Sequence, residues 1–82
     1  MAETITVTYF AALVDRAGCR SERLEVAEAT VGGLREAIAQ RHGPRTGDLA
    51  RLSAVLDEDR LLRDDAAPIG DEVDLLPPFA GG

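Results

Sequence analysis

The stretch EVDLLPPFAGG, residues 72–82, determines how the rest of the chain is interpreted. In residues 72–76 the apolar Val73 and Leu75 alternate with other side chains, which is the period of a β-strand with one buried face. Two prolines follow, and because proline lacks a backbone N–H and holds φ near −65°, they end the strand and direct the chain outward in an extended form. The final glycines have no Cβ and can enter a narrow channel beside another protein's backbone. The stretch predicts a last strand followed by a reactive tail.

The predicted tail consists of Pro77, Pro78, Phe79, Ala80, Gly81 and Gly82. At roughly 3.3–3.6 Å per residue, the four residues after Pro78 reach about 13 Å from the body, far enough to enter a neighbour's active site. A Gly-Gly ending alone is also compatible with a frayed terminus, but the proline stop and Phe79 favour a functional tail. We therefore expect one folded domain over residues 1–76 and a flexible, extended reactive tail over 77–82.

Length and composition predict a single small acidic domain. A chain of 82 residues has room for one modest core and no large internal cleft. The formal charge of −6 argues against nucleic-acid binding, which needs a basic footprint, and suits a basic partner. All nine basic residues are arginine, so no lysine side chain is available for a Schiff base or an isopeptide bond.

The cysteine content and the N-terminal sequence bear on location. A single Cys19 excludes an internal disulfide and any multi-cysteine metal or iron–sulfur site, which makes the cytosol the default compartment. Residues 1–3 lack the basic and apolar regions of a signal peptide, and no run of 18 apolar residues occurs. We expect a cytoplasmic protein with no membrane association.

Alternating side chains predict two strands near the N-terminus. Residues 4–10 alternate strictly and are rich in β-branched side chains. A turn, or one loose helical turn, is expected over 11–18. A second strand over 21–26 then places Leu24 and Val26 inward and pairs antiparallel with the first.

One main helix is expected in the middle of the chain. Thr30 is a good N-cap, and Gly43 and Pro44 are a stop signal. Between them the helical repeat is formed by Val31, Leu34, Ala37, Ile38 and Arg41.

Shorter elements fill the second half of the chain. Residues 45–52 are expected to form a loop with a short helical turn, and 64–70 another loop. Short strands are expected over 53–56 and 60–62, before the last strand, 72–76. The order β-β-α-β-β-β predicts an α+β domain with one main helix on one face of its sheet.

Few side chains are candidates for catalysis or ligand binding. His42 ends the helix, where capping or exposure is favoured over catalysis, and Cys19 follows a glycine without a readable cation cluster, which favours an incidental thiol. Gly32 and Gly33 open the helix but lack the full phosphate-loop pattern. The carboxylates lack the spacing of a calcium loop, so no metal site is predicted and most of them belong to solvated turns. Asp71 and Asp74, close to the tail, can steer it toward a basic partner.

Two outward apolar residues indicate a docking surface. Phe10 follows Thr6 and Thr8 on the polar face of the first strand, and Leu76 follows Asp74 on the polar face of the last. If these strands are neighbours, Phe10 and Leu76 form an apolar patch at the base of the tail. Single apolar surface residues are normal, whereas a contiguous patch is typical of a partner interface.

The chain resembles the MoaD/ThiS-type ubiquitin-like sulfur carriers, most closely the small subunit of molybdopterin synthase. The resemblance covers nearly the whole chain, and its specific part is a Gly-Asp-Glu-Val strand leading into Pro-Pro-x-x-Gly-Gly. It is carried by Val7 to Ala11, Thr30-Val31 with Leu34-Arg35, Ala54-Val55, Gly70 to Val73, and Leu76 to Gly82.

The resemblance implies a ubiquitin-like β-grasp fold, with the first and last strands parallel and adjacent in a mixed sheet. It also implies that a MoeB-type E1-like enzyme uses ATP to adenylate the Gly82 carboxylate. A sulfur donor then replaces the adenylate and leaves a thiocarboxylate. The tail would enter the MoaE-type large subunit and donate sulfur to cyclic pyranopterin monophosphate, which yields molybdopterin.

In this interpretation the chain is the non-catalytic, sulfur-donating subunit. Gly82 carries the chemistry, Phe10, Leu76 and Phe79 contact the partner, and the chain itself binds no cofactor. Val14 and Leu56 depart from the family pattern, where arginine and asparagine are usual. Carriers for thiamine, cysteine or natural-product biosynthesis, and ubiquitin-like protein modifiers, are the alternatives.

Overall fold

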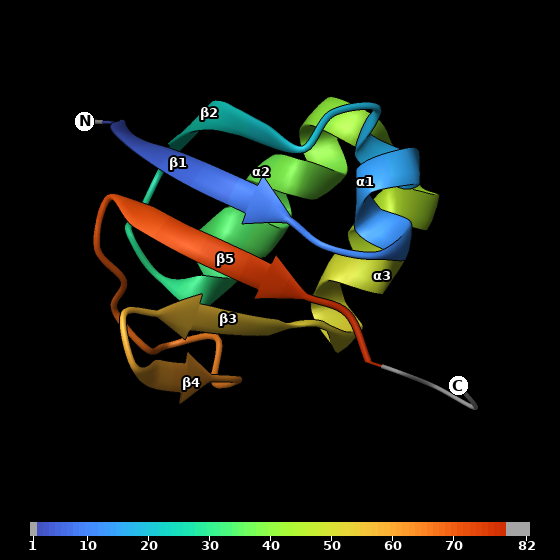
Figure 1. Ribbon diagram of the computed structural model, residues 1–82. Coiled ribbons are helices and arrows are strands. Elements are labelled where there is room, and N and C mark those ends of the chain that lie inside the picture. The colour runs from blue at the N-terminus through green and yellow to red at the C-terminus, as the bar shows by residue number, and fades with distance from the viewer. Residues whose placement is uncertain (1, 79–82) are drawn as a thin grey trace.

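Two parallel strands, β1 (Glu3–Tyr9) and β5 (Glu72–Leu76), lie side by side at the centre of the sheet in the computed structural model, which describes residues 2–78 (Figure 1). The strand order is β2-β1-β5-β3-β4. On one side β2 (Ser21–Val26) is antiparallel to β1, and on the other β3 (Ala54–Asp57) is antiparallel to both β5 and β4 (Arg60–Leu62). The predicted α+β class, the mixed sheet and the pairing of the first two strands are confirmed.

In the part of the chain that the structure describes, three helices accompany the sheet. The longest, α2 (Val31–His42), crosses behind it in the view of Figure 1, while α1 (Ala12–Ala17) and α3 (Pro44–Leu52) lie near the end toward which β1 and β5 point. Within residues 2–78, the opposite face of the sheet, toward the viewer, carries no helix. The helices therefore bury one face of the sheet and leave the other exposed.

The core fills the space between the sheet and α2, as the alternation and the helical repeat predict. Every second residue of the strands points inward, and α2 adds an apolar stripe. The fully or almost fully buried apolar side chains include Ile5, Val7, Tyr9, Leu24, Val26, Val31, Leu34, Ile38, Val55, Val73 and Leu75. The predicted N-cap is also confirmed, since the Thr30 hydroxyl accepts a hydrogen bond from the Gly33 N–H at 3.0 Å.

Residues 45–52 were expected to form a loop with a short helical turn, and this prediction is wrong. They belong to α3, which begins with Pro44 at its first position and buries Thr46, Gly47 and Ala50. A Cβ at Gly47 would lie 2.6 Å from the Ala39 Cβ, so the missing side chain allows α3 to pack closely on α2. Because this buried face is made of small residues, it lacks the large apolar repeat that signals a helix.

The other differences from the expected elements are small. The segment 11–18, expected to be a turn or one loose helical turn, forms the six-residue helix α1, which ends at Gly18 with a left-handed φ of 77°. The first strand ends at Tyr9 instead of Phe10, and β3 is shifted by one residue toward Asp57. The element order is therefore β-α-β-α-α-β-β-β.

Candidate functional site

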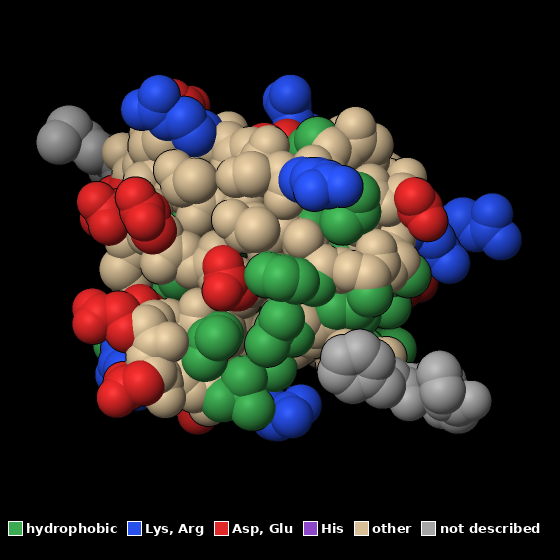
Figure 2. Space-filling model, viewed as in Figure 1, with side chains coloured by type: hydrophobic (Ala, Val, Ile, Leu, Met, Phe, Trp, Pro, Cys, Tyr) green, Lys and Arg blue, Asp and Glu red, His purple; other side chains and the backbone are tan. Residues whose placement is uncertain are grey.

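The open face of the sheet carries an apolar patch next to the end of β5. Leu56 of β3 lies opposite Leu61 of β4, and Ala54 lies opposite Leu76 at the last position of β5. Leu56 and Leu76 are half-buried, and the Leu61 side chain is 53% exposed. Figure 2 shows apolar side chains gathered over this part of the molecule. We call Leu56, Leu61 and Leu76 the open-face patch.

Phe10 lies beyond the neighbouring strand at the same end of the sheet. Tyr9 pairs with Leu75, so Phe10 and Leu76 each follow one member of this pair. Phe10 is 41% exposed. The strand order therefore brings Phe10 and Leu76 to adjacent strand ends, as the docking hypothesis requires. The docking hypothesis did not include Leu56 and Leu61. Leu56 could have been found from the strand alternation, because residues 54 and 56 point away from the core while Val55 points inward.

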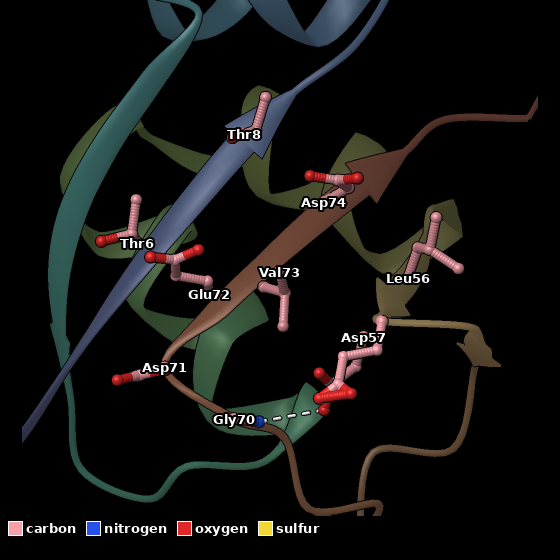
Figure 3. Close-up of a pocket in the computed structure, with 10 residues that line it drawn as sticks. Thr6, Thr8, Leu56, Asp57, Gly70, Asp71, Glu72, Val73 and Asp74 are labelled. Atoms are coloured by element: carbon pink, nitrogen blue, oxygen red, sulfur yellow. Dashed lines mark hydrogen bonds between the residues drawn. The ribbon is translucent and has the colours of Figure 1, made fainter.

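A groove of about 390 Å³ with an acidic lining adjoins the open-face patch. Thr6 pairs with Glu72 and Thr8 with Asp74, which sets hydroxyls beside carboxylates across the two central strands (Figure 3). Leu56 lines the same groove and so links it to the patch. Carboxylates next to apolar side chains favour a partner surface that combines basic and apolar groups.

Asp57, at one end of this groove, departs from the expected solvated turn. Its side chain accepts a hydrogen bond from the Gly70 N–H at 3.0 Å and another from Arg60 at 3.2 Å, and the residue is only 7% exposed. These bonds join the β3–β4 turn to the segment that enters β5. Asp57 therefore holds the shape of the groove's end.

The N-terminus of α2 offers no anion site. The N–H of Val31 donates to the Ala67 carbonyl at 3.0 Å, and that of Gly32 donates to the Asp65 carbonyl at 2.9 Å. The N–H of Gly33 is taken by the Thr30 cap. Since a helix N-terminus binds phosphate through unpaired N–H groups, phosphate binding at the glycine pair gains no support.

His42 takes part in a polar cluster with Tyr9, Glu22 and Arg41, in which Tyr9, Glu22 and His42 are shielded and Arg41 is exposed. The Tyr9 hydroxyl donates to Glu22 Oε2 at 2.5 Å, and His42 Nε2 lies 2.5 Å from the same oxygen. Arg41 donates to Glu22 Oε1 at 2.9 Å. The cluster joins β1, β2 and the end of α2. This cluster was not predicted from the sequence. Glu22 does alternate in step with the inward-facing Leu24 and Val26, and a carboxylate on the buried face of a strand needs hydrogen-bond partners.

The environment of the cluster sets the protonation of its members. Desolvation pushes the pKa of Glu22 up, but the hydrogen bonds from Tyr9, His42 and Arg41, with the charge of His42, outweigh it and hold the pKa below the ordinary value of 4.5. Burial and the neighbouring Glu22 carboxylate raise the pKa of the Tyr9 hydroxyl above its ordinary range. Desolvation and the Glu22 charge also raise the pKa of the Cys19 thiol, which disfavours the thiolate that a nucleophile needs.

The structure describes only the beginning of the predicted tail. Pro77 is buried and Pro78 exposed, directly after the end of β5. Phe79, Ala80, Gly81 and Gly82, including the predicted partner contact and the predicted reactive residue, lie outside the described residues. Among residues 2–78, no helix has the length and apolar character to cross a membrane, and no three metal-ligating side chains come together.

The topology, with a helix behind a mixed sheet whose first and last strands are parallel and central, defines a ubiquitin-like β-grasp domain. A match of residues 7–82 to the ThiS family model shows that the chain belongs to the ThiS family. This match confirms the family resemblance that was inferred from the strand motifs and the tail sequence. None of the curated proteins matches the sequence significantly.

Several solved structures share the fold, among them the following three. SAMP1 from Haloferax volcanii is 28% identical, with a TM-score of 0.70, 98% of this chain covered and 100% of that one. A second structure of the H. volcanii protein, small archaeal modifier protein 1, is 27% identical with a TM-score of 0.66, covering 93% of this chain and 98% of that one. A putative molybdopterin converting factor, subunit 1, from Pyrococcus furiosus is 25% identical with a TM-score of 0.69, and the match covers 93% of this chain and 98% of that one. The fold is that of a ubiquitin-like sulfur carrier or protein modifier.

Proposed function

We propose that this chain is a sulfur carrier that acts as the small subunit of molybdopterin synthase, with Gly82 as the site of the cargo. The observation that carries the proposal is the placement of β5. This strand ends at Leu76, which belongs to the open-face patch, and leads directly into the Pro-Pro-x-x-Gly-Gly sequence. A docking surface next to the start of a thin tail suits a protein that delivers its terminus into a partner's active site.

The chemistry explains why two partners are needed. A terminal carboxylate with a pKa near 3.5 is ionised at neutral pH and a poor acceptor for a nucleophile. A MoeB-type enzyme would join the Gly82 carboxylate to the AMP part of ATP, with release of pyrophosphate. Sulfide released by a sulfur donor would then attack the acyl carbon, so that a C–S bond forms while the C–O bond to AMP breaks and AMP leaves. The resulting thiocarboxylate would supply sulfur to cyclic pyranopterin monophosphate in the active site of the MoaE-type subunit.

The open face is the proposed contact with these partners. Phe10 and Leu76, together with Leu56 and Leu61, would provide the apolar centre, and Glu72 and Asp74 the acidic edge. Phe79, within the tail, would contact the partner. Phe10→Asp or Leu76→Asp should weaken binding to the large subunit while leaving the monomer folded. Unchanged affinity in both variants would argue against this interface.

Protein modification is a second candidate, because SAMP1, 28% identical, is a small archaeal modifier protein by name. The same activated Gly82 carboxylate would then form an amide with a lysine of a target protein. Carriers for thiamine, cysteine or natural-product biosynthesis use the same terminal chemistry with another acceptor.

Separate readouts of the acceptor distinguish these candidates. The purified chain, loaded with sulfur, is combined either with the large subunit and cyclic pyranopterin monophosphate or with a cell extract and ATP. Molybdopterin formation that is lost on deletion of Gly82 is the expected result. Amide-linked conjugates without molybdopterin would favour the modifier. If the chain, expressed in a strain that lacks its own thiamine sulfur carrier, restores thiamine synthesis but yields no molybdopterin in the purified assay, the thiamine branch is favoured. A variant without Gly82 that retains sulfur transfer would refute the carrier role of the tail.

A further inference from the structure

Arg35 of α2 places a guanidinium group at the junction of three chain segments. Its side chain is only 10% exposed. Its Nε donates to the Ala50 carbonyl at 3.2 Å, its Nη2 to the Ser53 carbonyl at 2.7 Å, and its Nη1 to the Arg63 carbonyl at 3.1 Å. Nη1 also lies 2.6 Å from Asp65 Oδ1. A shielded charge is stable only when its donors are satisfied, and here three of the four acceptors are backbone carbonyls.

The three carbonyls surround the open end of the β3–β4 hairpin. Ser53 directly precedes β3, and Arg63 directly follows β4. Val55 pairs with Leu62, so Ser53 and Arg63 lie at the end of the hairpin away from its tight turn. Ala50 belongs to the last turn of α3. The planar fork of Arg35 therefore ties the hairpin and the end of α3 to α2, in a geometry that a lysine cannot reproduce.

The same end of the hairpin borders the start of the tail. Ala54, the residue after Ser53, pairs with Leu76, the last residue of β5, and the chain then leaves the sheet at the buried Pro77. Leu56 and Leu61 of the open-face patch lie on the same hairpin. A shift of the hairpin relative to α2 would thus move the apolar patch and the exit of the tail together.

We propose that Arg35 is a positioning residue that holds the open-face patch and the tail exit in the arrangement needed for docking. The proposal rests on the proposed function, because it assigns Arg35 an effect on partner binding through Leu56, Leu61 and Pro77. Within residues 2–78, the hydrogen-bond acceptors of Arg35 are Ala50, Ser53, Arg63 and Asp65, so the proposed effect on docking is indirect. Its three carbonyl bonds distinguish it from a residue that only fills the core.

The test compares variants of Arg35 with matched controls. Arg35→Lys keeps the charge and loses the fork, and Arg35→Ala removes both. Asp65→Asn removes only the ion pair of a carboxylate that is 73% exposed, which leaves the three carbonyl bonds. Arg51→Ala removes an exposed arginine whose partner is Asp48, in α3. Amide hydrogen exchange and the dissociation constant for the MoaE-type large subunit are measured at a temperature where each variant is folded.

In Arg35→Lys and Arg35→Ala, we expect the backbone amides of β3 and β4 to exchange hydrogen faster than in the wild type. The amides of β2 should keep their protection from exchange. The affinity of both variants for the large subunit should fall about tenfold or more, with a smaller fall for lysine. Asp65→Asn and Arg51→Ala should stay within about twofold of wild type, because the carboxylate of each ion pair is exposed, 73% for Asp65 and 72% for Asp48. A merely stabilising residue would lower the melting temperature and leave the affinity of the folded chain unchanged.

Two results would overturn the proposal. One is an unchanged dissociation constant in folded Arg35→Ala and Arg35→Lys. The other is the failure of both variants to fold, since Arg35 would then support the whole domain instead of positioning one hairpin. If the wild-type chain does not bind the large subunit, the proposed function fails. The exchange measurement then still decides whether Arg35 holds the hairpin, because it requires no partner.

Discussion

Replacing Glu22 by glutamine tests whether the cluster of Tyr9, Glu22, Arg41 and His42 stabilises the fold through its charge. The substitution keeps the shape of the side chain and one oxygen acceptor, but removes the negative charge that two shielded groups contact. The Glu22 and His42 side chains are 12% and 13% exposed. Glu25→Gln is the matched control, because Glu25 is an exposed glutamate on the same strand.

The expected loss follows from the contacts. A hydrogen bond to a charged group contributes about 1.5–3 kcal/mol, and a neutral one about 1 kcal/mol. Glutamine thus forfeits roughly 1 kcal/mol at each of the contacts with Tyr9 and His42. Arg41 is 62% exposed, so its pair with Glu22 adds little. The total, about 2 kcal/mol, corresponds to a fall in melting temperature of roughly 10 °C for a domain of this size.

The pH dependence of stability independently tests whether the ionised form of Glu22 stabilises the fold. Because the pKa of Glu22 in the folded chain lies below its ordinary value of 4.5, the unfolded chain binds more protons as the pH falls below that value. The contribution of Glu22 is therefore present above its unfolded pKa and is lost as the pH falls through the folded pKa. Thermal unfolding followed by circular dichroism should show a clear gap between wild type and Glu22→Gln at neutral pH. The gap should shrink in acid.

Equal melting temperatures of wild type and Glu22→Gln at neutral pH would refute this reasoning. A gap that persists undiminished in strong acid would also contradict it, because a protonated Glu22 resembles glutamine. Glu25→Gln should leave the melting temperature nearly unchanged at all pH values.

Three further predictions concern other parts of the molecule. Tyr9 is the only tyrosine, and its raised pKa predicts that tyrosinate absorbance stays absent above pH 10.0 until the chain unfolds, with stability falling as the pH rises above that value. Gly47→Ala should destabilise the fold by about 1–2 kcal/mol in urea unfolding, because its Cβ would lie 2.6 Å from the Ala39 Cβ. Leu61→Asp should weaken binding to the large subunit about tenfold in calorimetry, while Leu52→Asp, at a leucine that is even more exposed (65% against 53%) but outside the patch, should not.

Each of these predictions can fail in a defined way. Titration of Tyr9 near its ordinary pKa in the folded chain would contradict its burial against Glu22. A Gly47→Ala variant as stable as wild type would show that α3 can move away from α2 without cost. Equal losses of affinity in Leu61→Asp and Leu52→Asp would point to a general charge effect instead of a defined patch.

The main strands and the central helix could be predicted from sequence because each has a regular apolar repeat. Ile5, Val7 and Tyr9 repeat with a period of two, and Val31, Leu34 and Ile38 have helical spacing between clear cap signals. The placement of Phe10 and Leu76 at adjacent strand ends could be predicted only with the family resemblance, because sequence patterns do not give strand order.

Other features depend on contacts that no local pattern contains. The helix α3 packs through Gly47 and Ala50, which are too small to mark a helical face. Arg35 donates hydrogen bonds to the carbonyls of Ala50, Ser53 and Arg63, which lie 15, 18 and 28 positions further along the chain. Likewise, Glu22 meets Tyr9 and His42 only because α2 ends beside the first two strands. These features arise from packing between distant segments, which becomes visible only in three dimensions.

Intact mass spectrometry of the C-terminus tests the central claim most directly. The purified chain is incubated with a MoeB-type adenylating enzyme, ATP and a sulfur donor, beside a variant that lacks Gly82. The account predicts the exchange of one oxygen for sulfur at Gly82 in the full chain and no exchange in the deletion variant. A full chain that keeps its carboxylate with every such enzyme would contradict the assignment of a sulfur carrier.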